Sequence, residues 1–353
     1  MRQSVVTSAG DGCDGTVVCL GEALFDCLAK EKGVPREQVT GWMPFPGGAP
    51  ANVAAALAKL GVRVAFVSAL GRDELGDQMV DLLSGQGVDV GAVQRVERPT
   101  RDVLVVSDAG GDREFVGFGG PNDTFADTVI DAESLPEDVL AHASALVMGS
   151  LGLAFPATAA AMRRALEVAK RGTCSVLIDV NWRPVFWDGV ENPRETIAPY
   201  IESADIVKLS EEEAEWLLDI PGSDALDHPC KVLERLPQAK GVLVTAGALG
   251  SAYCFRGAGG KLDLSGRVPV LRVSVQDTTG AGDAFLAGFL FSMVQAGGLE
   301  ALRSDADKLC AAVEFATACG AFTTTKPGAI GAQPSEQQAK ELLATAAFAA
   351  SAA

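Results

Sequence analysis

The chain has 353 residues, of which 48% are hydrophobic and 21% are charged, and its formal net charge is −17. This length is sufficient for one large α/β domain or two smaller ones with a substantial core. The acidic balance leaves no basic stripe for nucleic acid, and no segment reaches the roughly 18 apolar residues that a membrane span needs. We therefore expect no nucleic-acid partner and no membrane partner.

The N-terminal segment, residues 1–16, is rich in serine, threonine and glycine and lacks the apolar region of a secretory signal. We expect it to be flexible. It is either a plain flexible start or the remnant of an organelle transit peptide. The cytoplasm is therefore the expected compartment, and the plastid stroma is the alternative.

The cysteines and histidines suggest structural roles. Eight cysteines form no CxxC pair and have mostly apolar neighbours, which predicts reduced, largely buried thiols in a reducing compartment. They are residues 13, 19, 27, 174, 230, 254, 310 and 319. The two histidines, His142 and His228, stand in ordinary helix or loop surroundings, so zinc binding and histidine-based catalysis are not expected.

Strand-like and helix-like segments alternate along most of the chain, which predicts a mainly parallel sheet flanked by helices. The expected strands are residues 16–22, 62–71, 145–150, 174–180, 204–210 and 241–247. The expected helices are residues 51–61, 73–87, 156–172, 211–219, a segment that follows residue 283, and about 305–321. After residue 336 we expect a C-terminal helix with an alanine-rich tail, residues 337–353.

Two regions, residues 24–45 and 92–118, break this alternation with short β-like pieces and turns. The second contains a hairpin pattern with "DAGGD" (108–112) at its turn. We interpret the two regions as one small β-sheet that projects from the main body. Its apolar residues Phe115, Val116 and Phe118 could also pack against a second copy, which would make a homodimer.

The segment "DTTGAGD" (277–283) lies between the strand-like residues 271–275 and an apolar, helical run. Gly280 and Gly282 allow a tight turn whose N–H groups point into one concavity at a helix N-terminus, where an anion is favoured. Asp283 falls in the first helical turn. An anion hole beside a carboxylate suits phosphoryl transfer, and the alternative is a plain helix N-cap with Thr278 or Thr279 as the cap.

The segment "PFPGGAPANVAAALAKLG" (44–61) places two glycines before a helix. A backbone can approach a ligand closely at Gly47 and Gly48, and Asn52 offers both a donor and an acceptor. The alternative is an ordinary Gly/Pro loop before a helix.

Together the two segments resemble the signatures of the ribokinase-like (PfkB-type) carbohydrate kinases, and the fructokinases among them. The likeness covers about residues 17–334 and includes "GEALFD" (21–26), "VSALGRDELG" (67–76), "DVNWR" (179–183), "KLSEEEAEWL" (208–217) and "VLVTAG" (242–247). The resemblance implies a three-layer α/β/α kinase domain, residues 17–336, with a β-sheet lid formed by about residues 24–45 and 92–118.

The resemblance also implies an activity, the ATP-dependent phosphorylation of a sugar, with fructose to fructose 6-phosphate as the first expectation. Another sugar, a sugar acid or a nucleoside remains an alternative acceptor. A kinase-shaped interaction protein without catalysis is a further alternative. Such a protein would be expected to lose the GAGD segment or Asp283, and both are intact in this chain. A dinucleotide-binding oxidoreductase would need GxGxxG after the first strand, where this chain has "GEALFD".

For catalysis the resemblance makes Asp283 the base for the sugar hydroxyl, with an anion hole from the backbone of Gly280, Ala281 and Gly282. It assigns five residues to the sugar: Asp26, Gly47, Gly48, Asn52 and Arg183. A turn aspartate is the alternative for Asp26, and a surface arginine paired with Asp188 is the alternative for Arg183.

The implied cofactors are ATP and Mg²⁺, with K⁺ as a further candidate. The residues expected at the nucleotide are Lys208, Thr245, Gly247, Gly250 and Thr278. Glu213 would order Mg²⁺ through water, or form a capping box with Ser210. Asp277, with the backbone of Thr279, would join a monovalent-cation site or simply form a strand-end turn.

Two segments depart from the pattern of the fructokinases. Where they often have an Arg-Asn pair before Pro-Ser-Ala, this chain has "GFGGPNDTFAD" (117–127), so a sugar contact is expected to be missing. Where they often have "DPNLR", this chain has "DVNWR", so Trp182 is expected to reshape the pocket.

Overall fold

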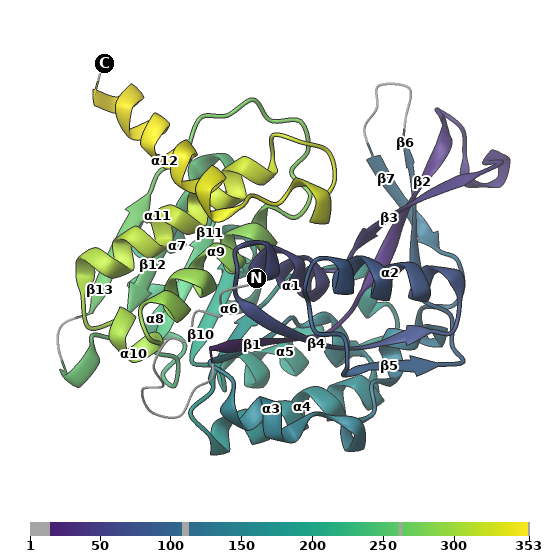
Figure 1. Cartoon of the computed structure of the whole chain (residues 1–353), viewed down its shortest axis with the longest axis horizontal. Helices are drawn as coiled ribbons and strands as arrows, with labels where there is room; N and C mark the ends of the chain where they lie inside the picture. The colour runs from purple at the N-terminus through teal and green to yellow at the C-terminus, as the bar shows by residue number, and fades with distance from the viewer. Residues whose placement is uncertain (1–14, 108–112, 261–262, 352–353) are drawn as a thin grey trace, which may run out of the picture.

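A nine-stranded sheet with helices on both faces forms the centre of the computed structural model, which describes residues 15–107, 113–260 and 263–351 (Figure 1). The strand order is β13-β12-β11-β10-β9-β8-β1-β4-β5. The strands are β1 (Thr16–Leu20), β4 (Arg63–Gly71), β5 (Val93–Val96), β8 (Ala145–Met148), β9 (Ser175–Asp179), β10 (Ile206–Ser210), β11 (Gly241–Thr245), β12 (Ser251–Phe255) and β13 (Leu264–Val268). Neighbours from β11 to β5 are parallel, and β12 and β13 add an antiparallel edge.

The central strands are apolar because both of their faces are covered. In β1, Val17 and Val18 are fully buried and belong to the cores on opposite faces of the sheet. Continuous apolar runs are typical of parallel strands buried in this way. The predicted three-layer arrangement is confirmed, and the carboxyl ends of the parallel strands meet at one edge of the sheet.

Two groups of helices form the outer layers. One face packs against α1 (Ala49–Lys59), α2 (Glu74–Gly85), α9 (Ala281–Gln295), α10 (Leu299–Leu302), α11 (Ala306–Thr323) and α12 (Glu336–Ser351). The other face packs against α3 (Glu137–His142), α4 (Pro156–Arg171), α5 (Pro193–Ile201), α6 (Glu211–Leu218), α7 (Gly222–Asp227) and α8 (Cys230–Glu234). The predicted alanine-rich tail is part of α12 as far as Ser351. No helix within the described ranges is both long and apolar enough to cross a bilayer.

A second sheet projects from this body, as predicted, and we call it the lid (Figure 1). Its order is β3-β2-β6-β7, built from β2 (Leu24–Lys32), β3 (Trp42–Gly47), β6 (Arg101–Ser107) and β7 (Arg113–Phe118). Arg36 donates hydrogen bonds to the carbonyl oxygens of Val116 and Phe118, 3.1 Å each, and so covers the β7 edge.

The lid is smaller than the sequence predicted. Residues 93–96 form β5, which pairs with β4 at the edge of the main sheet and not with the lid. Phe118 packs against Phe115, Phe125 and Phe186 of its own chain. The predicted turn at residues 108–112 lies outside the described residues. A homodimer through the lid stays a prediction.

The strand predicted at residues 271–275 is wrong. This segment follows Pro269, which cannot donate to a strand ladder, and it has no partner strand within the described part of the chain. Val275 is 60% exposed, so the alternating apolar residues do not face a core.

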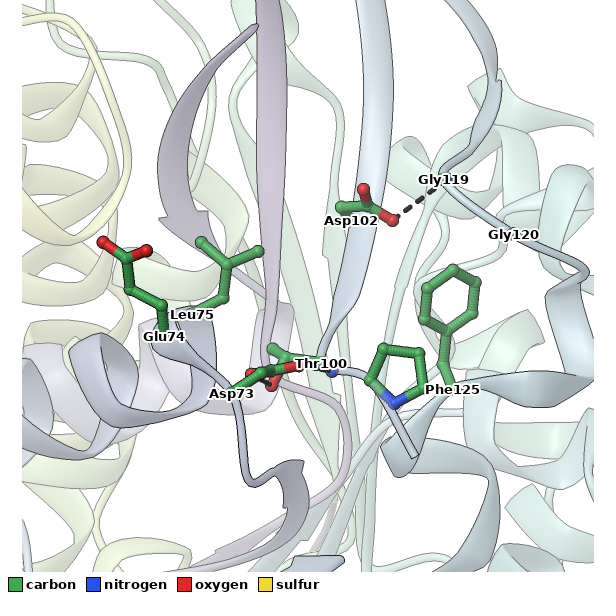
Figure 2. A pocket seen from close by; sticks show the side chains of 9 residues that line it. Asp73, Glu74, Leu75, Thr100, Asp102, Gly119, Gly120 and Phe125 are labelled. Carbon is green, nitrogen blue, oxygen red and sulfur yellow. Dashed lines mark hydrogen bonds between the residues drawn. The ribbon is translucent and has the colours of Figure 1, made fainter. Parts of the chain in front are cut away.

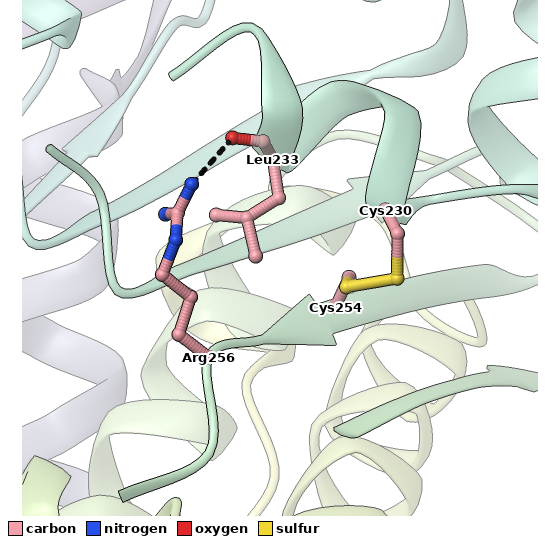
Figure 3. Close-up of a disulfide and its surroundings, with 4 residues drawn as sticks. All are labelled: Cys230, Leu233, Cys254 and Arg256. Atoms are coloured by element: carbon pink, nitrogen blue, oxygen red, sulfur yellow. Dashed lines mark hydrogen bonds between the residues drawn. A yellow bond between two sulfur atoms is a disulfide. The ribbon is translucent and has the colours of Figure 1, made fainter. Parts of the chain in front are cut away.

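The prediction of reduced cysteines is also wrong at one pair. Cys230 and Cys254 form a disulfide between α8 and β12 (Figure 3). The residues are 24 apart in sequence, but the packing of α8 on β12 brings their Cα atoms to 5.2 Å, within the range for a disulfide. Arg256 joins the same elements by donating a hydrogen bond to the Leu233 carbonyl, 3.1 Å away. Cys19, Cys27, Cys310 and Cys319 are free thiols, and Cys13 lies outside the described residues.

A disulfide that closes a loop of this length restricts the unfolded chain, so we expect Cys230→Ser to lower the free energy of unfolding by about 3 kcal/mol in oxidising buffer. Urea unfolding of the wild type and the variant measures the difference. In reducing buffer the two proteins should be nearly equal. Cys310→Ser, which changes a free thiol, is the matched control. A difference that persists in reductant would contradict this account.

Candidate active site

The turn before α9 has the geometry of an anion site. Gly280 is the N-cap of α9 with φ +75°, a conformation that favours glycine, and a Cβ there would lie 2.7 Å from the Cβ of Ala329. Ala281 N–H donates to the carbonyl of Thr278 (3.2 Å). The next N–H groups, of Gly282 and Asp283, belong to the first turn and have no intrahelical acceptor. Both N–H groups can therefore hold an anion. The anion hole predicted from Gly280, Ala281 and Gly282 stays a prediction.

Asp283 meets the other signature segment across the interface between α1 and α9. Asn52 Nδ2 donates to Asp283 Oδ2 (2.8 Å), although the residues are 231 apart in sequence. Asn52 is 5% exposed, and its Oδ1 is buried with no hydrogen-bond partner among the described residues. A buried acceptor of this kind is expected to receive a hydrogen bond from a ligand or a water molecule.

The surroundings of Asp283 suit a general base. Burial raises the pKa of the Asp283 carboxyl to about 6, and the charge of Asp179 acts in the same direction. The hydrogen bond from Asn52 and the charges of Lys208 and Arg183 lower this pKa. The carboxyl is therefore largely ionised at neutral pH and still able to accept a proton.

Lys208 and Asp179 form a buried ion pair beside the anion site. Lys208 Nζ lies 2.8 Å from both carboxylate oxygens of Asp179, and the two residues are 6% and 4% exposed. A Cβ on Gly282 would lie 3.5 Å from this Nζ, so the ammonium group is next to the first turn of α9. Burial lowers the pKa of Lys208, but the charges of Asp179, Glu213 and Asp283 outweigh it and raise the pKa overall. Lys208, predicted at the nucleotide, therefore lies at the anion hole and stays charged.

Glu213 forms the capping box that was one of its two predicted roles. Its Oε2 accepts from the Ser210 N–H (2.8 Å), and Ser210 Oγ accepts from the Glu213 N–H (3.1 Å). Its Oε1 accepts from the Trp182 N–H (2.6 Å). Burial and the Asp179 charge raise the pKa of Glu213. Each oxygen keeps a second lone pair, so this carboxylate can also receive a water of a hydrated Mg²⁺. No group of three or more His, Cys, Asp or Glu residues in the described ranges could hold a metal ion.

The predicted sugar residues gather where the lid joins the body. A Cβ on Gly47 would lie 3.3 Å from Asp26 Oδ2, which places that carboxylate against the glycine turn. Gly48 has φ +100°, and a Cβ there would lie 2.7 Å from the carbonyl oxygen of Glu22. Glu22 Oε1 in turn accepts from the Ala49 N–H at the start of α1 (3.2 Å). The structure thus brings Asp26, Gly47 and Gly48 to the N-terminal end of the helix that carries Asn52.

Arg183 lies at the exposed rim of the site and donates to the carbonyl of Trp182 (2.8 Å). Its charge lowers the pKa of Asp283, so its guanidinium group is within electrostatic range of the base. A pocket reshaped by Trp182 stays a prediction. Trp182 stacks on Trp216 of α6 with ring centroids 4.1 Å apart and packs with the core on that face of the sheet, which fixes the loop to α6.

The remaining nucleotide residues lie at the ends of neighbouring elements. Thr245 ends β11, and Thr278 is exposed in the turn before α9. Gly247 has φ +46° and open space around its Cα. Gly250 has a packing role, because a Cβ there would lie 2.3 Å from the carbonyl oxygen of Val268.

Asp277 ties the turn to the segment after α11. Its Oδ1 accepts from the N–H and the hydroxyl of Thr279 (3.0 and 2.6 Å), and its Oδ2 accepts from the Gly328 N–H (3.0 Å). A turn is therefore present here as predicted, although residues 271–275 before it are not a strand, and a cation at this place stays a prediction.

Two residues of this site were missed by sequence reasoning. Asp179 ends β9 and Glu22 follows β1, both at the carboxyl ends of parallel strands. Burial raises the pKa of Glu22 to about 8, with contributions from the charges of Asp127 and Asp283. An acidic residue directly after a buried strand was the available signal, since such residues point to the ligand edge of the sheet.

A helix N-terminus with free N–H groups, a carboxylate of raised pKa and a charge-compensated lysine are the parts that phosphoryl transfer requires. They lie together at the carboxyl edge of a three-layer α/β/α fold, which defines a phosphotransferase class of site.

Comparisons with known proteins give the same class. Residues 14–336 match the model of the pfkB family of carbohydrate kinases. The chain is 36% identical over 329 residues to Fructokinase-1 of Zea mays, covering 93% of this chain and 97% of that protein. The structure resembles the ATP-bound fructokinase of Xylella fastidiosa, with 31% identity, a TM-score of 0.82 and coverage of 94% and 99% of the two chains. It also resembles a Vibrio cholerae fructokinase double mutant solved with fructose, ADP and potassium, with 26% identity, a TM-score of 0.77 and coverage of 95% and 100%.

The chain therefore belongs to the pfkB family of carbohydrate kinases. The expectations of a ribokinase-like fold and of an ATP-dependent carbohydrate kinase are confirmed.

If Asp283 is the base, kcat/KM should fall as the pH drops through about 6, because the protonated carboxyl cannot accept a proton. Asn52→Leu removes a hydrogen bond that lowers this pKa, so the acidic limb should move to higher pH. Arg183→Met should move it in the same direction, whereas Arg183→Lys keeps the charge and should leave it in place. The pH profile of kcat/KM checks all three variants. A limb that stays in place in both Asn52→Leu and Arg183→Met would speak against Asp283 as the titrating group.

Proposed function

We propose that this protein transfers the γ-phosphate of ATP to the 6-hydroxyl group of fructose. The observation that carries the proposal is the Asn52–Asp283 hydrogen bond, which holds a carboxylate of raised pKa at the N-terminus of α9. The names of the similar maize and Xylella proteins support fructose as the acceptor. Because the segment 117–127 departs from the fructokinase pattern, the test includes other acceptors.

In this proposal Asp283 accepts the proton of the attacking hydroxyl group as that oxygen approaches the γ-phosphorus. The N–H groups of Gly280 and Gly282, with the ammonium group of Lys208, stabilise negative charge on the moving phosphoryl group. The Ala281 N–H would join them on releasing the Thr278 carbonyl. Asp26 and Asn52 orient the sugar through its hydroxyl groups.

Mg²⁺ would neutralise charge on the phosphates, and Glu213 is the carboxylate that would order its water. Arg183, at the exposed rim, is placed for a charge-assisted contact with the phosphoryl group. Thr245, Gly247, Gly250 and Thr278 are the proposed neighbours of the nucleotide. Potassium in the similar Vibrio structure supports K⁺ at Asp277 as part of the same proposal.

ADP release from Mg-ATP should be measured with fructose, ribose, glucose, a keto-deoxy sugar acid and nucleosides as acceptors. We expect turnover with fructose. In Asp283→Asn, kcat should fall by about 10²–10⁴-fold, which is the range that general-base catalysis supplies. Asp81→Asn is the matched control, since Asp81 is exposed on α2.

Turnover with a different acceptor would correct the substrate and keep the class of reaction. Silence with every acceptor, from folded protein that binds ATP, would overturn the proposal and favour a non-catalytic, kinase-shaped interaction protein.

A further inference from the structure

The chain passes between the body and the lid four times, at residues 21–23, 48, 97–100 and 119–121. The first two crossings lie at the proposed sugar residues Asp26 and Gly47. The last two meet around a single side chain, Arg101, the first residue of β6. The fourth crossing belongs to the segment 117–127 that departs from the fructokinase pattern.

Arg101 is fully buried, and its side chain donates hydrogen bonds to Asp127 and Asn122. Its Nε and Nη2 donate to the two carboxylate oxygens of Asp127 (2.7 and 2.9 Å). Its guanidinium carbon lies 4.6–5.3 Å from the centroids of four rings, those of Phe118, Phe125, Phe155 and Phe186. The guanidinium group therefore has a strongly preferred position. If it moved away from Asp127 and the four rings, its charge would remain buried without a partner.

Asn122 connects this arginine to the loop of Arg183. Its Oδ1 accepts from Arg101 Nη1 (2.7 Å), and its Nδ2 donates to the carbonyl of Phe186 (2.9 Å). The Phe186 N–H donates in turn to the carbonyl of Arg183 (3.0 Å). One amide therefore joins the base of the lid to the loop whose charge acts on Asp283.

The opposite side of the same strand is hollow. Thr100 and Asp102, whose side chains alternate with Arg101 along the chain, line a cavity of about 300 Å³ between the lid and the start of α2 (Figure 2). Across it Asp102 Oδ1 accepts from the Gly119 N–H (3.0 Å). The base of the lid is thus fixed firmly on the Arg101 side and has room on the Asp102 side.

We propose that Asn122 is a positioning residue that couples the angle of the lid to the Arg183 loop, through Arg101 on one side and Phe186 on the other. The inference rests on the proposed function, since the lid and this loop both border the proposed sugar site. It assigns to the segment 117–127 a mechanical role in place of the missing sugar contact.

Two variants and a matched control test the coupling. Asn122→Ala removes both side-chain hydrogen bonds and keeps only the bond from Arg101 Nη2 to the backbone carbonyl of residue 122 (3.0 Å). Asn122→Asp keeps a side-chain acceptor for Arg101 but loses the donor to Phe186. We expect each to raise the KM for the sugar about tenfold, the effect of losing a hydrogen bond in a charged network, with the KM for ATP changed less than about twofold. Asn192→Ala should change neither, because Asn192 is exposed and its side chain makes no capping bond at the start of α5.

Amide hydrogen exchange of the ligand-free protein gives a readout that needs no substrate. Both variants should exchange faster in β6 and β7 and also in residues 184–187, while Asn192→Ala should not. Faster exchange confined to residues near 122, or KM values for sugar and ATP that rise together, would overturn the coupling. If the wild type phosphorylates no acceptor, the proposed function fails, and the exchange pattern alone still decides the coupling.

Discussion

The charge of one buried ammonium group underlies the whole site. In a chain with a formal net charge of −17, the carboxylates of Asp179, Glu213 and Asp283 all act on Lys208. Without Lys208, the buried carboxylates would repel each other and a phosphorylated ligand alike, and breaking a buried pair typically costs 3–5 kcal/mol. With it, one carboxylate serves as a counter-ion and another keeps a pKa of about 6. The same compensation explains how an acidic protein can present a local site for a polyanion.

Close backbone approach is the second constraint. Gly48 lies against the backbone of Glu22, and Gly280 lies against Ala329. Any residue with a Cβ at position 48 or 280 would clash with these neighbours. Each contact fixes the N-terminus of one helix, α1 or α9, and the direct packing of these two helices brings Asn52 and Asp283 within hydrogen-bond distance. The lid is built on the same junction, which means that the geometry of the sugar end and the attachment of the lid are not independent.

Local sequence patterns predicted most of the elements. Apolar runs predicted the buried strands, and glycine with a following charge predicted the turn and first residues of α9. The pattern failed where a strand needs a partner. Residues 93–96 were expected in the lid but pair with β4. Residues 271–275 alternate between apolar and polar side chains but have no neighbouring strand among the described residues. Apolar residues at every second position indicate that a segment can form a strand. Whether the strand forms depends on hydrogen bonding to a neighbouring strand.

The sequence by itself determined the class of chemistry, because the segments 44–61 and 277–283 together resemble the signatures of the PfkB-type carbohydrate kinases. Only the tertiary structure decided which distant residues join them. Asp179 pairs with Lys208 from a neighbouring strand, Cys230 reaches Cys254 across a helix–strand contact, and Asn122 bridges Arg101 and Phe186. Such contacts depend on strand order and on the crossing of helices over the sheet, which are global properties that no local spacing of residues records.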